Sequence, residues 1–194
     1  EKKLLSDPSL RCVIANSDLV RRELLRYHRL APEKVITIPN GIDPEKCHPP
    51  ATREDRAQAK QSLGLETTDT VLLFVGNNYH RKGLIHALEA VAQHKNKPII
   101  LLVAGTGREK QYRRFAQSHG IAGKVRFLGS VRDTKPLYRA AGLLVLPTLY
   151  DPFSNVCLEA MAHGVPVMTT PNNGASEIIV EGKTGWVAHA RETP

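Results

Sequence analysis

Residues 71–105 read VLLFVGNNYHRKGLIHALEAVAQHKNKPIILLVAG, and two apolar runs in this stretch frame a helical pattern. The runs at 71–76 and 99–105 show no strict alternation of apolar and polar residues, whereas residues 84–94 carry apolar side chains spaced by three and four. Apolar runs without alternation are typical of strands that are buried on both faces of a parallel sheet. The stretch therefore predicts a strand, a helix and a second strand of such a sheet.

The same alternation continues to the end of the chain. Helices are predicted at 137–142 and 155–163, and the second ends at Gly164, a residue type that readily takes the left-handed conformation that closes a helix. Further strands are predicted at VRFLG (125–129), LLVLP (143–147), VPVMTT (165–170) and TGWVAH (184–189). We therefore expect an α/β fold, with a Rossmann-like parallel sheet that carries helices on both faces.

The first part of the chain repeats the alternation on a smaller scale, with a strand at 13–17, a helix at 18–29 and a strand at 35–41. This unit is too small to bury a core of its own. The proline-rich, polar stretch DPEKCHPPATRED follows at residues 43–55, and its composition predicts a linker.

Both ends of the chain indicate a piece of a longer protein. The opening residues EKK resemble a helix cut midway, and RETP at 191–194 follows the last predicted strand without a helix to cover the sheet. We interpret residues 1–42 as the tail of one domain and residues 43–69 as a linker and the start of a second. Residues 70–194 would then be most of that second domain, incomplete at its C-terminal end.

The composition is that of an ordinary globular protein, with 41% hydrophobic and 24% charged residues in 194. No apolar run approaches the roughly 20 residues that cross a bilayer, and the start lacks the apolar stretch of a secretory signal, so we expect a cytoplasmic protein. Three cysteines without CxxC spacing indicate neither a disulfide framework nor a zinc site. No Asp-x-Asp pair and no HExxH-like spacing occurs, so we expect no metal.

The net charge of +8 favours anionic partners. Only 5% of the residues are aromatic and the cations are scattered, so few side chains are placed to stack on bases and a nucleic-acid partner is not expected. The charge also suits a protein that visits an acidic inner-membrane surface, and we hypothesise a peripheral contact of that kind.

The loop GNNYHRKG, residues 76–83, is predicted to join the end of a strand to the start of a helix. In open parallel α/β sheets, ligands bind at the carboxyl ends of the strands. Arg81 and Lys82, free backbone N–H groups and the positive end of a helix dipole together suit a phosphate. The alternative is a solvated pair of charges without a ligand. The position of the pair favours the phosphate site.

Two other glycine-containing stretches lack the spacing of known nucleotide motifs. In GTGREK at 105–110, Gly105 and Gly107 begin a GxG, but Lys110 stands where a dinucleotide fingerprint has its third glycine. In EGKTG, Glu177 replaces the leading glycine of a P-loop and a strand follows in place of a helix. The glycines at 105–107 are compatible with a ligand packed close to the backbone or with an ordinary tight turn.

The stretch DPFSNVCLEA, residues 151–160, places Asp151 in a predicted loop and Glu159 in the first turns of the following helix. Ser154 or Asn155 can cap that helix, and unpaired N–H groups around 153–156 are expected to point between the two acids. Carboxylates accept hydrogen bonds and amides donate them, so the arrangement suits a sugar or a ribose. The alternative makes Asp151 a loop cap and pairs Glu159 with a nearby cation, and spacing alone does not choose between the two.

Together these segments resemble the retaining, two-domain GT-B glycosyltransferases, the nucleotide-sugar family that includes bacterial lipopolysaccharide and mannosyl transferases. The motifs that carry the resemblance are VIANSDLVRREL, VITIPNGID, the RKG loop, the GTG turn, VRFLGSV, DPFSN with CLEAMA, PNNGASEII and GKTGW. Their order and spacing match through essentially the whole chain. The details around NNYHRKG and DPFSN resemble the lipopolysaccharide-core glucosyltransferase branch.

The resemblance implies that residues 70–194 are the donor-binding C-terminal domain of a GT-B fold, and it implies a role for each matching position. Four residues would form the catalytic centre: Arg81 and Lys82 on the donor diphosphate, Glu159 on the ribose hydroxyls, and Asp151 on the transferred sugar. The other donor-binding candidates are Gly76, Asn77, Gly105, Val131, Phe153, Ser154, Asn155 and Val156. Of these, Val131 would lie near the base, and the backbone of 153–156 would hold the sugar and the phosphate.

This chain departs from the family pattern at two positions. The first acid is Asp151, where the family usually has glutamate, and Ser154 stands where glycine is common. Both changes fall at the hexose end of the expected site, so they put the identity of the sugar in doubt.

The resemblance implies a hexosyltransferase that moves a hexose from a nucleoside diphosphate sugar, expected to be UDP-glucose-like, to a hydroxyl of a glycan or lipid-linked acceptor in lipopolysaccharide or other surface-glycan synthesis. No cofactor and no metal is expected, because Arg81 and Lys82 would stabilise the leaving diphosphate. The acceptor site would belong to the first domain, so this chain alone would bind donor without turnover. The alternatives are a non-catalytic donor-binding subunit completed by a partner chain and a basic nucleic-acid-binding domain.

Overall fold

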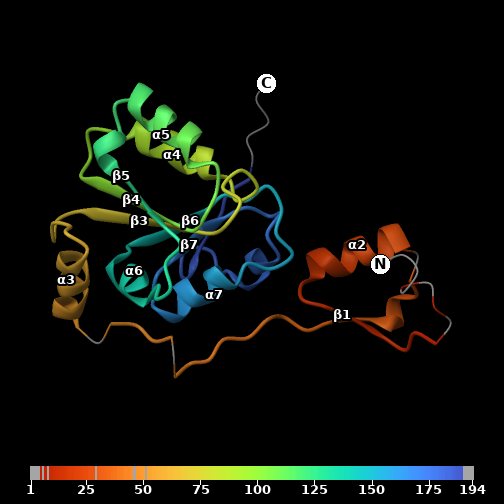
Figure 1. Cartoon of the computed structure of the whole chain (residues 1–194). Coiled ribbons are helices and arrows are strands. Elements are labelled where there is room, and N and C mark those ends of the chain that lie inside the picture. The colour runs from red at the N-terminus through yellow and green to blue at the C-terminus, as the bar shows by residue number, and fades with distance from the viewer. Residues whose placement is uncertain are drawn as a thin grey trace.

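The computed structural model describes residues 5, 7, 9–28, 30–45, 47–50 and 52–189. These residues form a six-stranded sheet and a separate two-stranded sheet (Figure 1). The order in the larger sheet is β5-β4-β3-β6-β7-β8, and all its strand pairs are parallel. Its strands are β3 (Thr70–Val75), β4 (Ile99–Ala104), β5 (Val125–Gly129), β6 (Leu143–Leu146), β7 (Val167–Thr169) and β8 (Gly185–Val187). The predicted α/β fold with a parallel sheet is confirmed.

Helices cover both faces of the larger sheet (Figure 1). They are α3 (Arg53–Ser62), α4 (Leu84–Gln93), α5 (Glu109–Ser118), α6 (Lys135–Ala140) and α7 (Asn155–Ala162), with the short 3-10 helices η2 (Ala122–Lys124) and η3 (Gly174–Ile178). On one face α4 packs against α5, and on the other face α3 packs against α6, beside α7. Among the described helices, none combines the length and apolarity that crossing a bilayer requires.

The strand order contains a reversal between β3 and β6. From β3 the chain moves outward through β4 to β5, and it then returns to β6 on the other side of β3. The loop after β3 leads to α4 on one face, whereas the loop after β6 leads to α7 on the opposite face (Figure 1). Such a reversal leaves a crevice outside the carboxyl ends of the two strands, where open α/β sheets bind their ligands.

The core lies between the sheet and its two layers of helices. Leu73, Leu102 and Leu144, one from each of the three central strands, are at most 1% exposed. Helix α4 buries Leu84, Ala87, Leu88 and Val91, which are spaced by three, one and three positions. This one-sided burial is the reason that its apolar spacing identified the helix in the sequence.

Two helices were not predicted from the sequence. Helix α3 begins at Arg53, inside the stretch predicted to be a linker. It begins there because Thr52 and Asp55 form a capping box, in which each side chain accepts a hydrogen bond from the other residue's backbone N–H, at 3.1 and 3.0 Å. Helix α5 buries only Tyr112 and Ala116, and most of its other residues are polar, so no apolar run marks it in the sequence.

The first part of the chain forms a small unit that consists of β1 (Val13–Ala15), α2 (Asp18–His28), the short η1 (Pro32–Lys34) and β2 (Val35–Thr37). Strands β1 and β2, both of which the sequence predicts, pair in parallel. The described residues between β2 and α3 form no helix or strand (Figure 1). The predictions for EKK at 1–3 and RETP at 191–194 fall outside the described residues.

Candidate functional site

The loops after β3 and β6 meet at the reversal in strand order. The backbone N–H of Leu149 donates a hydrogen bond of 2.8 Å to the carbonyl oxygen of Arg81. Gly83, which precedes α4, has a φ of 76°, and a Cβ at this position would lie 1.9 Å from the carbonyl oxygen of Pro147. Only glycine fits there, and it allows the two loops to approach closely enough to bring Arg81 and Lys82 to the crevice.

Lys82 lies inside this junction, with a side chain only 11% exposed. Its Nζ donates hydrogen bonds to the Asp151 carboxylate and, at 3.0 Å, to Ser154 Oγ. The side chain passes Gly76, where a Cβ would lie 3.1 Å from Lys82 Cγ. The glycine therefore leaves the space through which the long cationic side chain reaches the loop after β6.

Arg81 occupies the outer side of the same junction, since its side chain is 43% exposed. Its Nη1 donates a hydrogen bond of 3.2 Å to the carbonyl oxygen of Tyr150 and lies 3.6 Å from Asp151 Oδ2. Two cations thus share one carboxylate, which leaves a net positive charge at the crevice. A site of this charge suits a phosphate, and the solvated pair considered as an alternative does not describe the buried Lys82.

Both carboxylate oxygens of Asp151 have partners. The residue is 5% exposed, and its Oδ1 accepts a hydrogen bond of 3.1 Å from the backbone N–H of Phe153 while Oδ2 faces the two cations. A buried ion pair is stable only when further hydrogen bonds replace the lost water. Here Asp151 does act as a loop cap, as one of the two alternatives proposed, and it also binds the cations of the opposite loop.

The backbone amides that precede α7 are only partly free, which corrects the expectation of unpaired N–H groups throughout 153–156. The amides of Phe153 and Ser154 are paired with Asp151 Oδ1 and Asn173 Oδ1, each at 3.1 Å. The amides of Asn155 and Val156 have no hydrogen bond within the described part of the chain. These two N–H groups remain available at the positive end of α7.

Ser154 occupies the N-cap position of α7, but its side chain makes no capping hydrogen bond, contrary to the sequence prediction. Its Oγ accepts a hydrogen bond from Lys82 instead, and the residue is 3% exposed. A charged donor in a buried site competes successfully with a backbone amide for one hydroxyl. Asn155 does not cap the helix either, because it is the first helical residue.

Glu159 lies on α7 and faces α6. Its Oε2 accepts a hydrogen bond of 2.8 Å from the hydroxyl of Tyr138, whose ring stacks on His163 at 5.0 Å. Burial raises the pKa of Tyr138, and the Glu159 carboxylate raises it further, so this hydroxyl stays a donor. The expected alternative, an ion pair of Glu159 with a nearby cation, is not found among the described residues.

The thiol of Cys157, between the two acids in sequence, responds to both ends of the site. Burial raises its pKa to about 12, Asn173 and Lys82 lower it, and the charges of Asp151 and Glu159 raise it. Among the described residues, no hydrogen bond joins Glu159 to Arg81 or Lys82.

Asn173 is a residue that the sequence analysis did not single out. It is fully buried, and its Oδ1 accepts hydrogen bonds of 3.1 Å from the backbone N–H groups of Ser154 and Ala175. Its Nδ2 donates to Thr169 Oγ1 at 3.0 Å. One amide side chain thus ties the start of α7 to the end of β7 and to η3. The only signal in the sequence was the turn composition of PNNG.

The other predicted donor-binding residues lie at the carboxyl ends of β3, β4 and β5. Asn77 Oδ1 accepts hydrogen bonds from the N–H and the hydroxyl of Thr106 at 2.9 and 3.0 Å. Gly105 has a φ of 118°, and a Cβ there would lie 2.2 Å from the Gly76 carbonyl oxygen. Val131, after β5, is partly buried against the core. Asn77 and Gly105 thus hold two loops of the rim together.

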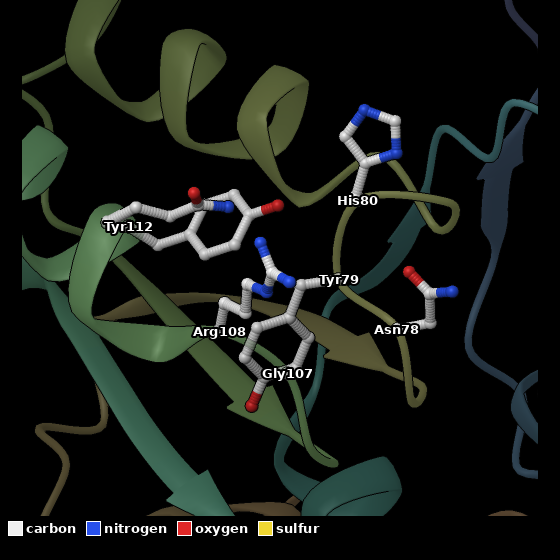
Figure 2. Close-up of a pocket in the computed structure, with 7 residues that line it drawn as sticks. Asn78, Tyr79, His80, Gly107, Arg108 and Tyr112 are labelled. Carbon is white, nitrogen blue, oxygen red and sulfur yellow. The ribbon is translucent and has the colours of Figure 1, made fainter.

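A hollow of about 540 Å³ opens beside these loops, over the ends of β3 and β4 (Figure 2). Figure 2 shows Asn78 and His80 on the loop after β3, and Arg108 and Tyr112 on the opposite side. Asn78 has a φ of 60°, which is uncommon for a residue other than glycine. The lining residues are Asn78, Tyr79, His80, Gly107, Arg108, Gln111 and Tyr112.

Metal ligands are not grouped in the described part of the chain: no cluster of three or more His, Cys, Asp or Glu residues is placed to hold an ion. The charged groups of the crevice are the side chains of Arg81, Lys82 and Asp151, with Glu159 on the adjacent helix.

Comparison with known proteins places these features in a family. The profile of "Glycosyl transferases group 1" matches residues 55–193, and that of "Glycosyltransferase Family 4" matches residues 3–46. An uncharacterized glycosyltransferase of Methanocaldococcus jannaschii, MJ1607, is 34% identical over 182 residues, which cover 90% of this chain and 46% of that protein. The lipopolysaccharide glucosyltransferase WaaG of Escherichia coli is 28% identical over 165 residues, covering 84% of this chain and 44% of WaaG.

Solved structures agree with this assignment. A crystal structure of WaaG superimposes with a TM-score of 0.81 at 26% identity, covering 90% of this chain and 48% of WaaG. Anabaena HepE in complex with UDP and glucose superimposes with a TM-score of 0.79 at 25% identity, covering 92% of this chain and 49% of HepE. The chain spans just under half the length of the curated relatives that it matches: it covers 46% of MJ1607 and 44% of WaaG.

Proposed function

Because the chain belongs to the group 1 glycosyltransferase family, we propose that it is the donor-binding part of a glycosyltransferase that moves a hexose from a nucleoside diphosphate sugar to an acceptor hydroxyl. The observation that carries this proposal is the cluster of Arg81, Lys82 and Asp151 at the crevice between β3 and β6. Its net positive charge lies where parallel α/β sheets bind nucleotides.

The diphosphate is assigned to the cationic side of the crevice. Arg81, with a side chain 43% exposed, can turn towards a ligand, whereas Lys82 is already fixed by Asp151 and Ser154. The free amides of Asn155 and Val156 add two donors at the positive end of α7. Positive groups that are fixed in advance stabilise the charge that develops on a leaving diphosphate. We propose that these cations take that part in the reaction and that no cofactor is needed.

The nucleoside is assigned to Glu159 and Val131. One carboxylate oxygen of Glu159 is bonded to Tyr138, and its other oxygen can accept hydrogen bonds from ribose hydroxyls. Val131 follows β5, on the same rim of the sheet. Since the HepE structures hold UDP and UDP-glucose, we propose UDP-glucose as the first donor to test, with retention of the anomeric configuration as in the family that the sequence resembles.

The sugar is assigned to the loop 151–156, with a role for Asp151 that differs from the sequence expectation. Both oxygens of Asp151 already have partners, Phe153 N–H on one and the two cations on the other. We therefore propose that Asp151 chiefly orients Lys82, and that Ser154 and the amides of Asn155 and Val156 contact the hexose. A longer glutamate would place its carboxylate further into the crevice, and this difference affects the sugar rather than the nucleotide.

The acceptor and the location of the enzyme are extensions of the same proposal. The similarity to WaaG supports a glycan or lipid-linked acceptor in the synthesis of lipopolysaccharide or another surface glycan. The net charge of +8 supports a cytoplasmic protein that contacts the anionic inner-membrane surface. Sedimentation with anionic vesicles at low salt tests this contact, and equal recovery with neutral vesicles would remove it.

Calorimetric titration of the 194-residue chain with UDP-glucose, GDP-glucose and ADP-glucose tests the donor site. We expect one of them to bind, and the Lys82→Ala and Arg81→Ala variants to weaken that binding by about tenfold to a hundredfold, as expected for loss of a charged hydrogen-bond partner. Lys110→Ala, which removes an exposed lysine of α5, is the matched control. Absence of binding to all three ligands, or unchanged affinity in both variants, would refute the proposal.

The same titrations separate donor binding from turnover. We expect the chain to bind donor without releasing the nucleotide, because the acceptor side would come from residues outside it. Rapid sugar transfer by this chain alone would contradict that part of the proposal.

A further inference from the structure

The small unit that contains β1, α2 and β2 contacts the sugar-binding loop itself. Ser17 lies at the start of α2 and is fully buried. Its Oγ donates a hydrogen bond of 2.7 Å to the carbonyl oxygen of Pro152, and it accepts one of 3.2 Å from the N–H of Val20. One hydroxyl thus caps α2 and at the same time fixes the loop residue next to Asp151.

The contact is tightly packed at Gly174. A Cβ at Gly174 would lie 2.5 Å from the Ser17 Cβ and 2.0 Å from the Pro152 carbonyl oxygen. Helix α2, the loop 150–155 and η3 therefore meet as closely as a glycine permits. A shift of Ser17, which caps α2, therefore meets Pro152 and Gly174 directly, because close-packed groups transmit displacement.

A second contact joins α2 to Tyr150. The hydroxyl of Tyr150 donates a hydrogen bond of 2.5 Å to Glu23 Oε2. Burial raises the pKa of Tyr150 to about 12, and the hydrogen bond to Glu23 acts in the same direction, so the hydroxyl remains a donor at neutral pH. The carbonyl oxygen of the same residue accepts the hydrogen bond from Arg81. Tyr150 therefore links α2 to the cationic site.

The donor-binding domain in turn fixes the position of α2. Both carboxylate oxygens of Glu177, in η3, accept hydrogen bonds from the first amides of the helix, Asp18 N–H at 2.8 Å and Leu19 N–H at 2.7 Å. At the other end of the loop, Asn40 Nδ2 donates a hydrogen bond of 2.7 Å to Asn155 Oδ1. A carboxylate at a helix N-terminus also interacts favourably with the helix dipole.

We propose that Ser17 and Glu23 are positioning residues for the sugar-binding loop, so that the affinity for the sugar part of the donor depends on residues outside the donor-binding domain. The inference rests on the proposed function of the crevice. It adds that α2 holds Tyr150 and Pro152 in place, and that loss of this support loosens the loop between Asp151 and Asn155. Lys82 and Glu159, which would bind the nucleoside diphosphate, have partners other than α2 and Tyr150. Arg81 donates to the Tyr150 carbonyl, but the Asp151 carboxylate is a second partner that does not depend on α2.

The test compares two ligands, UDP-glucose and UDP, by calorimetry on the whole chain. Tyr150→Phe and Glu23→Ala should weaken UDP-glucose binding by about threefold to tenfold, the loss expected for one hydrogen bond. The affinity of these variants for UDP should stay within about twofold of the wild-type affinity, because substitutions that do not touch a ligand change its binding only slightly. Glu23→Gln should restore UDP-glucose binding, because the amide oxygen can accept the Tyr150 hydrogen bond.

Tyr27→Phe is the matched control, since it removes a hydroxyl from a tyrosine of the same helix that is 66% exposed. Unchanged UDP-glucose affinity in Tyr150→Phe and Glu23→Ala would overturn the inference, as would an equal loss for both ligands, which would indicate general destabilisation. If the wild type binds neither ligand but binds GDP-glucose or ADP-glucose, the same comparison is made with that nucleotide sugar and its nucleoside diphosphate. If no nucleotide sugar binds, the proposed function fails first and this inference with it.

Discussion

Asp151 and Glu159 come from one short motif and yet occupy different surroundings. Asp151 is 5% exposed and lies against two cations and a backbone N–H. Glu159 is half-buried, and its partner is the hydroxyl of Tyr138. The loop after β3 supplies cations to one acid, whereas α6 supplies a neutral donor to the other. The first acid is therefore committed to an internal ion pair, whereas Glu159 Oε1 has no hydrogen bond within the described residues.

Replacing Asp151 tests the first half of this comparison and should have the largest effect. Asp151→Ala leaves the buried Lys82 charge without its carboxylate, and we expect the free energy of unfolding to fall by about 3–5 kcal/mol. Urea denaturation measures the change. Glu54→Ala, at an exposed position of α3, should stay within about 0.5 kcal/mol of the wild type. A loss below about 1 kcal/mol for Asp151→Ala would mean that the ion pair is not closed in solution.

Replacing Glu159 should cost less. In Glu159→Ala the buried Tyr138 hydroxyl loses its acceptor, and the free energy of unfolding should fall by about 1–3 kcal/mol. Glu159→Gln retains a carbonyl oxygen and should recover most of that loss. Equal destabilisation by Asp151→Ala and Glu159→Ala in the same urea experiment would break the distinction between the two acids.

Alkaline pH should weaken the Glu159 end of the site by a smaller amount. Burial raises the pKa of Cys157 to about 12 from the ordinary value of 9.0, and it also raises the pKa of Tyr138. Above about pH 9 the unfolded chain binds fewer protons than the folded chain, so stability falls as pH rises, by about 1.4 kcal/mol for Cys157 and about 0.4 kcal/mol for Tyr138 at pH 10.

Thermal unfolding between pH 8 and pH 10 measures this effect, and the midpoint temperature of unfolding should fall as the pH rises. Cys157→Ala should reduce the slope, whereas Cys12→Ala, at an exposed cysteine, should leave it unchanged. A midpoint that rises with pH, or a slope that is the same in Cys157→Ala, would show that the thiol is not buried as described.

The sequence predicted the strands of the larger sheet well, because buried parallel strands are continuous apolar runs. Helix α4 was found for a similar reason, since it buries one face. Helix α5 is predominantly polar and buries only two residues, and α3 begins in a polar stretch whose capping box was not recognised. Elements that bury little surface leave little pattern in the sequence.

The candidate site likewise contains features that the sequence predicted and features that it did not. The residue types at Arg81, Lys82, Asp151 and Glu159 indicated a nucleotide-sugar site, and the structure brings the first three together. The partner of Ser154 could not be predicted, because a local cap and a distant lysine are equally compatible with one hydroxyl in a sequence. Asn173 was missed because its hydrogen bonds reach residues up to 19 positions away.

The amino-acid sequence by itself determined the parallel α/β architecture, the loops that carry chemistry and the family, since these depend on local apolar patterns and on the order of motifs. Only the tertiary structure decided that Lys82 is buried against Asp151 and Ser154, that Glu159 faces Tyr138, and that the start of α2 contacts the loop beside Asp151. These contacts join residues 21 to 135 positions apart. They form because the strand order brings distant loops to one rim of the sheet, and no local pattern specifies that order.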